Sequence, residues 1–193
     1  SGKVTKSWPE RHSDAVLSID FSPDGKQIAT GGADKAVRIS DIASGRQTRL
    51  FEGHTHHVLG VSFRADGRIL ASSGADNVVK IWDMITGDRK KNIDGWDKEV
   101  TSLQFIGATD QILTSAGDNR VRVVRDSGAE VRSIAGLPDF MHGAAGTAAG
   151  GEGAVQNLPG WTPGDDFGFY SEKKPGVYFR LGIRNEQVGA GER

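Results

Sequence analysis

Three histidines lie within four residues of one another, at His54, His56 and His57. Imidazole nitrogens are common zinc ligands, and His142 or a carboxylate could complete a tetrahedral site with them. A zinc ion held in this way lowers the pKa of its bound water and makes a nucleophile of it. This pattern gives one hypothesis, a metal-dependent hydrolase that acts on ester, amide or phosphoester bonds.

Other reactive groups are scarce in the 193 residues. The absence of cysteine excludes a thiolate zinc site, a cysteine nucleophile and a disulfide scaffold. The sequence contains no Gly-x-Ser-x-Gly elbow, no phosphate-binding loop and no Gly-x-Gly-x-x-Gly fingerprint. The sequence therefore favours a protein without catalytic machinery and with no cofactor, and zinc remains the alternative.

The charges are balanced, with 24 Lys and Arg against 25 Asp and Glu, and both signs are mixed along the chain. Nucleic acids and anionic membranes require a basic excess on one face, so we expect neither as a partner. No stretch approaches 18 consecutive apolar residues, and no targeting segment is visible. A protein or peptide partner is the remaining expectation, and the compartment is left open.

The residues that could position any site belong to a repeat. Residues 16–41 and 58–83 match at a constant offset of 42, and residues 100–125 form a third copy. In the first copy, segments 16–21, 27–31, 36–40 and 46–51 show the alternation and the flanking turns of short strands. The Asp24-Gly25 and Asp66-Gly67 pairs are expected in turns, rather than in calcium loops. A period of 40–45 residues with four strands indicates propeller blades.

The phrases "FSPDGKQIATGGADKAVRISD", "GHTHHVLGVSF" and "LASSGADNVVKIWD" resemble WD-repeat β-propeller blades. The resemblance implies an all-β fold, a partial WD-repeat propeller with three clear four-stranded blades. We expect an N-terminal arm at 1–11 and blades at 12–53, 54–95 and 96–136.

The same resemblance implies a hydrogen-bonded network in each blade, built from a histidine, a Ser or Thr, an Asp and a Trp. A paired network of this kind fixes the strand register. The second blade has all four members, whereas Ser40 replaces the Trp of the first blade, and Trp96 and Val124 replace the His and Trp of the third. The expected members are His54, Ser72, Asp76 and Trp82 in blade 2; His12, Thr30 and Asp34 in blade 1; and Thr114 and Asp118 in blade 3.

Two further sets of residues are placed by the repeat. Because His54 has a role in the network, we expect His56 and His57 in a loop between blades. Basic residues recur on the third strand at Arg38, Lys80 and Arg122, where we expect solvated side chains that pair with a nearby Asp or Glu.

Three blades cannot close a ring, because propellers use four to eight. The chain from residue 12 onward is about four blade lengths. Self-association, with a dimer favoured, is one way to cover the exposed blade faces. The alternative is that residues 137–193 act as a fourth blade or a cap.

Residues 137–193 depart from the repeat and begin with an Ala/Gly-rich joint. The stretch "GDDFGFYSEKKPGVYFRLGIRNE" resembles zinc-dependent amidohydrolases of the aminoacylase/carboxypeptidase type, over about 149–187. Asp165 and Asp166 match an acidic pair of that family, but its zinc ligands have no counterpart here, so the resemblance carries no catalytic residue. The join of two unlike segments suggests a chimeric or truncated propeller. The favoured function is a non-enzymatic protein-binding or assembly scaffold.

Overall fold

The structure, a computed structural model, describes residues 12–135, and every regular element in this range is a β-strand. Blade 1 consists of β1 (Val16–Phe21), β2 (Gln27–Gly32), β3 (Val37–Asp41) and β4 (Gln47–Phe51). Blade 2 consists of β5 (Val58–Phe63), β6 (Ile69–Gly74), β7 (Val79–Asp83) and β8 (Arg89–Ile93). Blade 3 consists of β9 (Val100–Phe105), β10 (Gln111–Ala116), β11 (Arg120–Arg125) and β12 (Glu130–Ile134).

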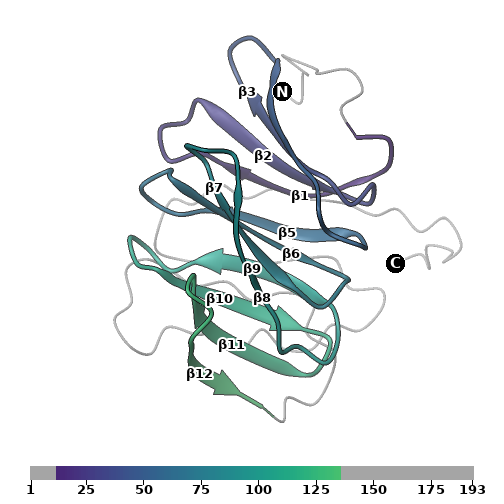
Figure 1. The fold of residues 1–193 in the computed structure, drawn as a ribbon, viewed down its shortest axis with the longest axis vertical. Coiled ribbons are helices and arrows are strands. Elements are labelled where there is room, and N and C mark those ends of the chain that lie inside the picture. The colour runs from purple at the N-terminus through teal and green to yellow at the C-terminus, as the bar shows by residue number, and fades with distance from the viewer. Residues whose placement is uncertain (1–11, 136–193) are drawn as a thin grey trace, which may run out of the picture. The chain divides into compact units, whose positions relative to one another are not determined.

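Each blade is a separate four-stranded sheet in which consecutive strands pair antiparallel. The three sheets follow one another in sequence order, and β5, the first strand of blade 2, contacts both β1 and β9, the first strands of its neighbours (Figure 1). The sequence prediction of an all-β partial propeller is confirmed. The expected strands of blade 1 agree with the observed ones to within one residue at each end.

The arm at 1–11 and the segment 137–193 lie outside the described residues. The same holds for the fourth blade or cap and for the amidohydrolase-like stretch expected there. Among the described residues, no helix is long and apolar enough to cross a membrane.

Both faces of the middle blade are covered. Every residue of β6 is buried, and β7 is buried from Val79 to Trp82. When a strand is covered on one face, its residues alternate between buried and exposed. β6 and β7 show no such alternation, because a neighbouring blade packs on each face.

The turn between the second and third strands has the same backbone in all blades. Lys35, Asn77 and Asn119 occupy equivalent positions with φ angles of 69°, 63° and 61°. Asn tolerates this left-handed conformation better than other residues with a side chain, and Lys does not share that tolerance. Blade 1 therefore carries the least suitable residue at this position.

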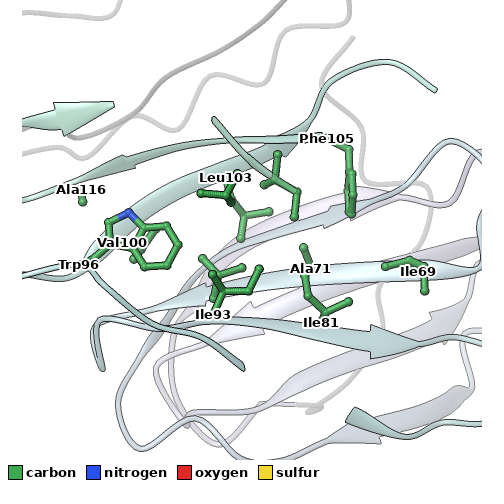
Figure 2. Close-up of a cluster of buried hydrophobic side chains, with 12 residues drawn as sticks. Ile69, Ala71, Ile81, Ile93, Trp96, Val100, Leu103, Phe105 and Ala116 are labelled. Atoms are coloured by element: carbon green, nitrogen blue, oxygen red, sulfur yellow. The ribbon is translucent and has the colours of Figure 1, made fainter. Parts of the chain in front are cut away.

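Apolar side chains fill the space between blades. Between blades 1 and 2, Val37 and Ile39 cluster with Val58, Val61 and Phe63. Between blades 2 and 3, a second cluster forms in the same way, and Figure 2 shows Leu103 and Phe105 of blade 3 facing Ala71 and Ile93 of blade 2.

Polar side chains of the first strands add hydrogen bonds between blades. The amide of Val61 donates to Oγ of Ser18 (3.1 Å), and the amide of Phe63 donates to Oδ2 of Asp20 (2.7 Å). The amide of Phe105 likewise donates to Oγ of Ser62 (3.2 Å). Ser62 stands 42 residues after Asp20, so the same position of the repeat makes the same connection to the next blade.

Candidate functional site

The polar network of blade 2 joins all four of its expected residues. Nδ1 of His54 lies 2.9 and 3.0 Å from the two carboxylate oxygens of Asp76, and Nε2 lies 2.8 Å from Oγ of Ser72. Nε1 of Trp82 donates to the same Oγ (2.8 Å). Every bond is satisfied when Nδ1 carries the proton and Ser72 donates to Nε2.

Local structure brings these residues together from separate elements. His54 precedes β5, Ser72 is on β6, Asp76 is in the β6–β7 turn and Trp82 is on β7. The backbone at Gly74 lies very close to the side chains of His54 and Asp76. A Cβ added there would be 2.6 Å from Nδ1 of His54 and 2.5 Å from Oδ1 of Asp76. Only glycine permits this approach of the ring and the carboxylate to the strand.

The order Asp76–His54–Ser72 is also that of a hydrolase triad. Ser72, however, is fully buried, and its oxygen already accepts a hydrogen bond from Trp82. A nucleophile must reach the substrate carbonyl, and this hydroxyl has no access to one. The network therefore acts as a structural tie between the segment before the blade and its sheet.

Blade 1 builds the same tie without the tryptophan. Nδ1 of His12 lies 2.8 Å from Oδ1 of Asp34, and Nε2 lies 2.8 Å from Oγ1 of Thr30. Ser40, at the position of Trp82, is buried and makes no hydrogen bond to this network among the described residues.

In blade 3 the tie has a different construction. Oδ2 of Asp118 accepts a hydrogen bond from the guanidinium of Arg122 (2.8 Å), which lies 5.5 Å from the centre of the Trp96 ring. Oγ1 of Thr114 donates to the carbonyl of Arg122 (3.2 Å). Trp96 packs in the place of the histidine, and neither its Nε1 nor Oδ1 of Asp118 has a hydrogen-bond partner within residues 12–135.

Two of the repeated basic residues, Arg38 and Arg122, pair with an Asp as expected, whereas Lys80 forms no ion pair among the described residues. The prediction that they are solvated was wrong for two of the three. Lys80 and Arg122 are each only 4% exposed. The pattern of a single strand does not show that an adjacent blade covers this face. Arg38 is half-buried and bonds Asp34 (3.1 Å), whereas Lys80 bonds the side chain of Asn92 (3.3 Å).

In blades 1 and 2, hydrogen-bond donors favour the ionised form of the tie aspartate. Burial opposes ionisation of Asp34, but hydrogen bonds from His12, Arg38 and two backbone amides outweigh it and lower its pKa from 3.8 to about 2. Burial likewise opposes ionisation of Asp76, and the bonds from His54 and the Thr55 amide lower its pKa. Burial lowers the pKa of Lys80, with Asp76 opposing the shift.

The histidines proposed as zinc ligands do not converge in the described structure. Both ring nitrogens of His54 are engaged in the tie, whereas His56 is exposed in the loop before β5 and lies against His57 at 4.4 Å between ring centres. Within residues 12–135, no three His, Asp or Glu side chains are grouped to hold a metal ion. His142, Asp165 and Asp166 lie outside the described residues, so a zinc site that includes them stays a prediction.

A recess of about 410 Å³ lies where the first strands of the three blades approach one another. Polar side chains at the same strand position of each blade, Asp20, Ser62 and Gln104, line it together with Ser18. The rest of the lining is apolar and comes from the same strands and from Pro23. Burial raises the pKa of Asp20, while the amides of Phe63 and Phe21 oppose the shift. This surface was not predicted from the sequence. The signal that could have indicated it is the recurrence of a polar residue every 42 positions, at Asp20, Ser62 and Gln104.

The three repeated sheets, with their ties and apolar contacts between blades, define a partial WD-repeat β-propeller. The family described as "WD domain, G-beta repeat" (WD40) matches residues 2–41 and 45–83. The chain thus contains WD40 repeats.

Curated proteins with similar sequence include the "Notchless protein homolog" of Arabidopsis thaliana, which is 50% identical over 40 residues, 21% of this chain and 8% of that protein. "Transducin beta-like protein 3" of Homo sapiens is 40% identical over 52 residues, 27% of this chain and 6% of that protein. The matches thus cover only a small part of these relatives.

Among solved structures, "Structure of U3-55K" and "Crystal structure of RRP9 WD40 repeats" each match with a TM-score of 0.65 and 23% identity. Each match covers 68% of this chain and 42% of the solved chain. At this identity the likeness shows the fold alone.

Proposed function

We propose that this chain is a non-enzymatic scaffold that binds protein or peptide partners on its WD40 blades and assembles with other chains. The observation that carries the proposal is the recess lined by the first strands of all three blades. Three separately tied sheets hold the lining residues in place, and a preformed surface reduces the entropy lost on binding. The matches to WD40 repeats support a role in protein assembly.

Self-association is part of the proposal, with a dimer as the favoured state. It is supported by Val16, Ile19 and Phe21 of β1, which are exposed in blade 1, although their equivalents in the other two blades are buried. Apolar surface in a repeat array is usually covered, either by a capping unit or by a partner.

Native mass spectrometry of the chain purified without chelator tests assembly and zinc together. We expect a metal-free complex of more than one chain. A compact monomer that retains stoichiometric zinc would contradict the scaffold and favour the metal-dependent hydrolase.

Selection from a random-peptide library tests the recess as the binding surface. We expect the selected peptides to bind the Gln104→Ala variant at least about tenfold more weakly than the parent chain, as for a residue near the centre of an interface. Lys90→Ala, an exposed position on β8, is the matched control and leaves binding unchanged. Equal binding to both variants would show that the recess is not the site.

A further inference from the structure

Asp20 lies in the recess without a basic partner among the described residues. No lysine, arginine or histidine of residues 12–135 contributes to the recess wall. Arg64 directly follows the lining residue Phe63, but its guanidinium bonds Asp66 (2.6 Å) and Asp126 (2.7 Å). The wall of the recess thus carries one carboxylate and no cation.

The aspartates of the ties provide a comparison. Asp34 bonds the guanidinium of Arg38 at 3.1 Å, and Asp118 bonds that of Arg122 at 2.8 Å. Burial raises the pKa of Asp20, whereas the donors around Asp34 lower the pKa of that carboxyl. A carboxylate that burial destabilises gains more from an added cation than one that is already paired.

The carboxylate of Asp20 is held in a fixed position and can still accept a hydrogen bond. Its Oδ2 accepts from the amide of Phe63 (2.7 Å), and its Oδ1 accepts from the amide of Phe21 (2.9 Å). The hydroxyl of Ser62 adds a third hydrogen bond. Because a carboxylate has about four acceptor positions, it can also take a donor from a ligand. A group held in place beforehand reduces the entropy lost on binding.

Apolar surface lies in the same recess. Phe21 is 44% exposed and Pro23 is also exposed, whereas the equivalents of Phe21 in the other blades, Phe63 and Phe105, are buried. Phe21 and Pro23 line the recess together with Asp20. A side chain with an alkyl stem and a terminal cation matches this surface, because its stem covers the apolar part while its charge reaches the carboxylate.

We propose that the recess binds a basic side chain, lysine or arginine, of a partner segment, with Asp20 as its counter-ion and with Phe21 and Pro23 in contact with its alkyl stem. This inference rests on the proposed function and adds the chemistry by which the recess selects a partner. The bond from the cation to the carboxylate is charge-assisted, which makes it stronger than a bond between neutral groups.

A nuclear magnetic resonance titration of the full chain at constant ionic strength tests the counter-ion. The probes are N-acetyl-lysine methylamide and N-acetyl-norleucine methylamide, which share the alkyl stem and differ in the ammonium group. We expect the lysine probe to shift the amide signals of Phe63 and Phe21 in a saturable way. Its dissociation constant should be at least about tenfold lower than that of the norleucine probe. Equal affinity for the two probes would overturn the inference.

A variant of Asp20 tests the same contact. Asp20→Asn removes the charge and keeps an oxygen that can accept from the Phe63 amide, and we expect it to weaken binding of the lysine probe at least about tenfold. Asp97→Asn is the matched control, since Asp97 is exposed in the loop before β9 and does not line the recess. The comparison of the two probes needs only the parent chain, so it decides the question even where Asp20→Asn does not fold.

The outcomes separate this inference from the proposed function. Library peptides that bind through Gln104 with no preference for a basic residue would overturn the counter-ion and leave the scaffold standing. Binding of the lysine probe that depends on Asp20, in a chain to which no library peptide binds, would support the cation site and contradict the recess as a surface for peptides.

Discussion

In blade 2 the carboxylate of Asp76 is held by His54, which precedes the sheet, whereas in blade 3 the carboxylate of Asp118 is held by Arg122 of the same hairpin. The first arrangement fastens an incoming segment to the blade. The second fastens only the turn to its own strand, and the incoming segment is held by packing of Trp96. The comparison shows that the buried carboxylate is the constant feature and that its donor can change.

The largest effect is expected at Trp82, because among the three blades only blade 2 has a tryptophan on its third strand. Trp82 is 3% exposed, stacks on Phe51 at 4.9 Å between ring centres and donates to Ser72. Trp82→Ala should lower the free energy of unfolding by about 3–5 kcal/mol, as measured by urea denaturation.

Val124→Ala is the matched change in blade 3, since Val124 occupies the position of Trp82 and is also 3% exposed. It removes two methyl groups, so we expect a loss of only about 2 kcal/mol. Equal losses for the two variants would mean that the tryptophan does not set blade 2 apart.

The second effect concerns the basic residues of the third strand. Arg122→Met leaves the buried carboxylate of Asp118 without a cation, and we expect a loss of about 3 kcal/mol in a urea titration. Lys80→Met should cost nothing or stabilise the protein, because His54 already holds Asp76 and burial of Lys80 lowers its pKa. A larger loss from Lys80→Met than from Arg122→Met would reverse the comparison.

The third effect is a dependence of stability on pH in blade 1. The pKa of Asp34 falls from 3.8 to about 2 on folding. Its contribution, at most about 2 kcal/mol, is therefore complete above the unfolded pKa and is lost as pH falls through the folded pKa. Asp34→Asn should flatten the loss of stability between these two values in urea titrations at successive pH. A slope identical to that of the parent would contradict the role of the tie.

The smallest effect is a gain. Lys35 adopts a left-handed φ of 69°, and blades 2 and 3 have asparagine at this position. Lys35→Asn should raise the free energy of unfolding by about 1 kcal/mol, because the strain of this conformation is relieved. Asn77→Lys is the reciprocal change, and we expect it to destabilise blade 2 by a similar amount. The change in the free energy of unfolding should therefore have opposite signs in the two variants, and the same sign in both would contradict the comparison.

The constant offset of 42 was enough to predict the strands, since a repeat carries its register from copy to copy. The residues of the polar network were predicted only through the resemblance to WD-repeat blades. Burial of Lys80 and Arg122 was not predicted, because the packing of blade on blade covers faces that a single strand pattern presents as open. The recess was missed for a related reason. Asp20, Ser62 and Gln104 are far apart in sequence and meet only when the blades stand side by side.

The completeness of each sheet determines how the described array would respond to force. No strand of one described blade pairs with a strand of another, and the blades are joined by side chains and by short segments such as residues 52–57. Tension applied at the two ends passes through these segments before it reaches any ladder of main-chain hydrogen bonds. We therefore expect each blade to unfold as one unit. Each unfolding event would lengthen the chain by roughly 140 Å, the contour length of about 42 residues.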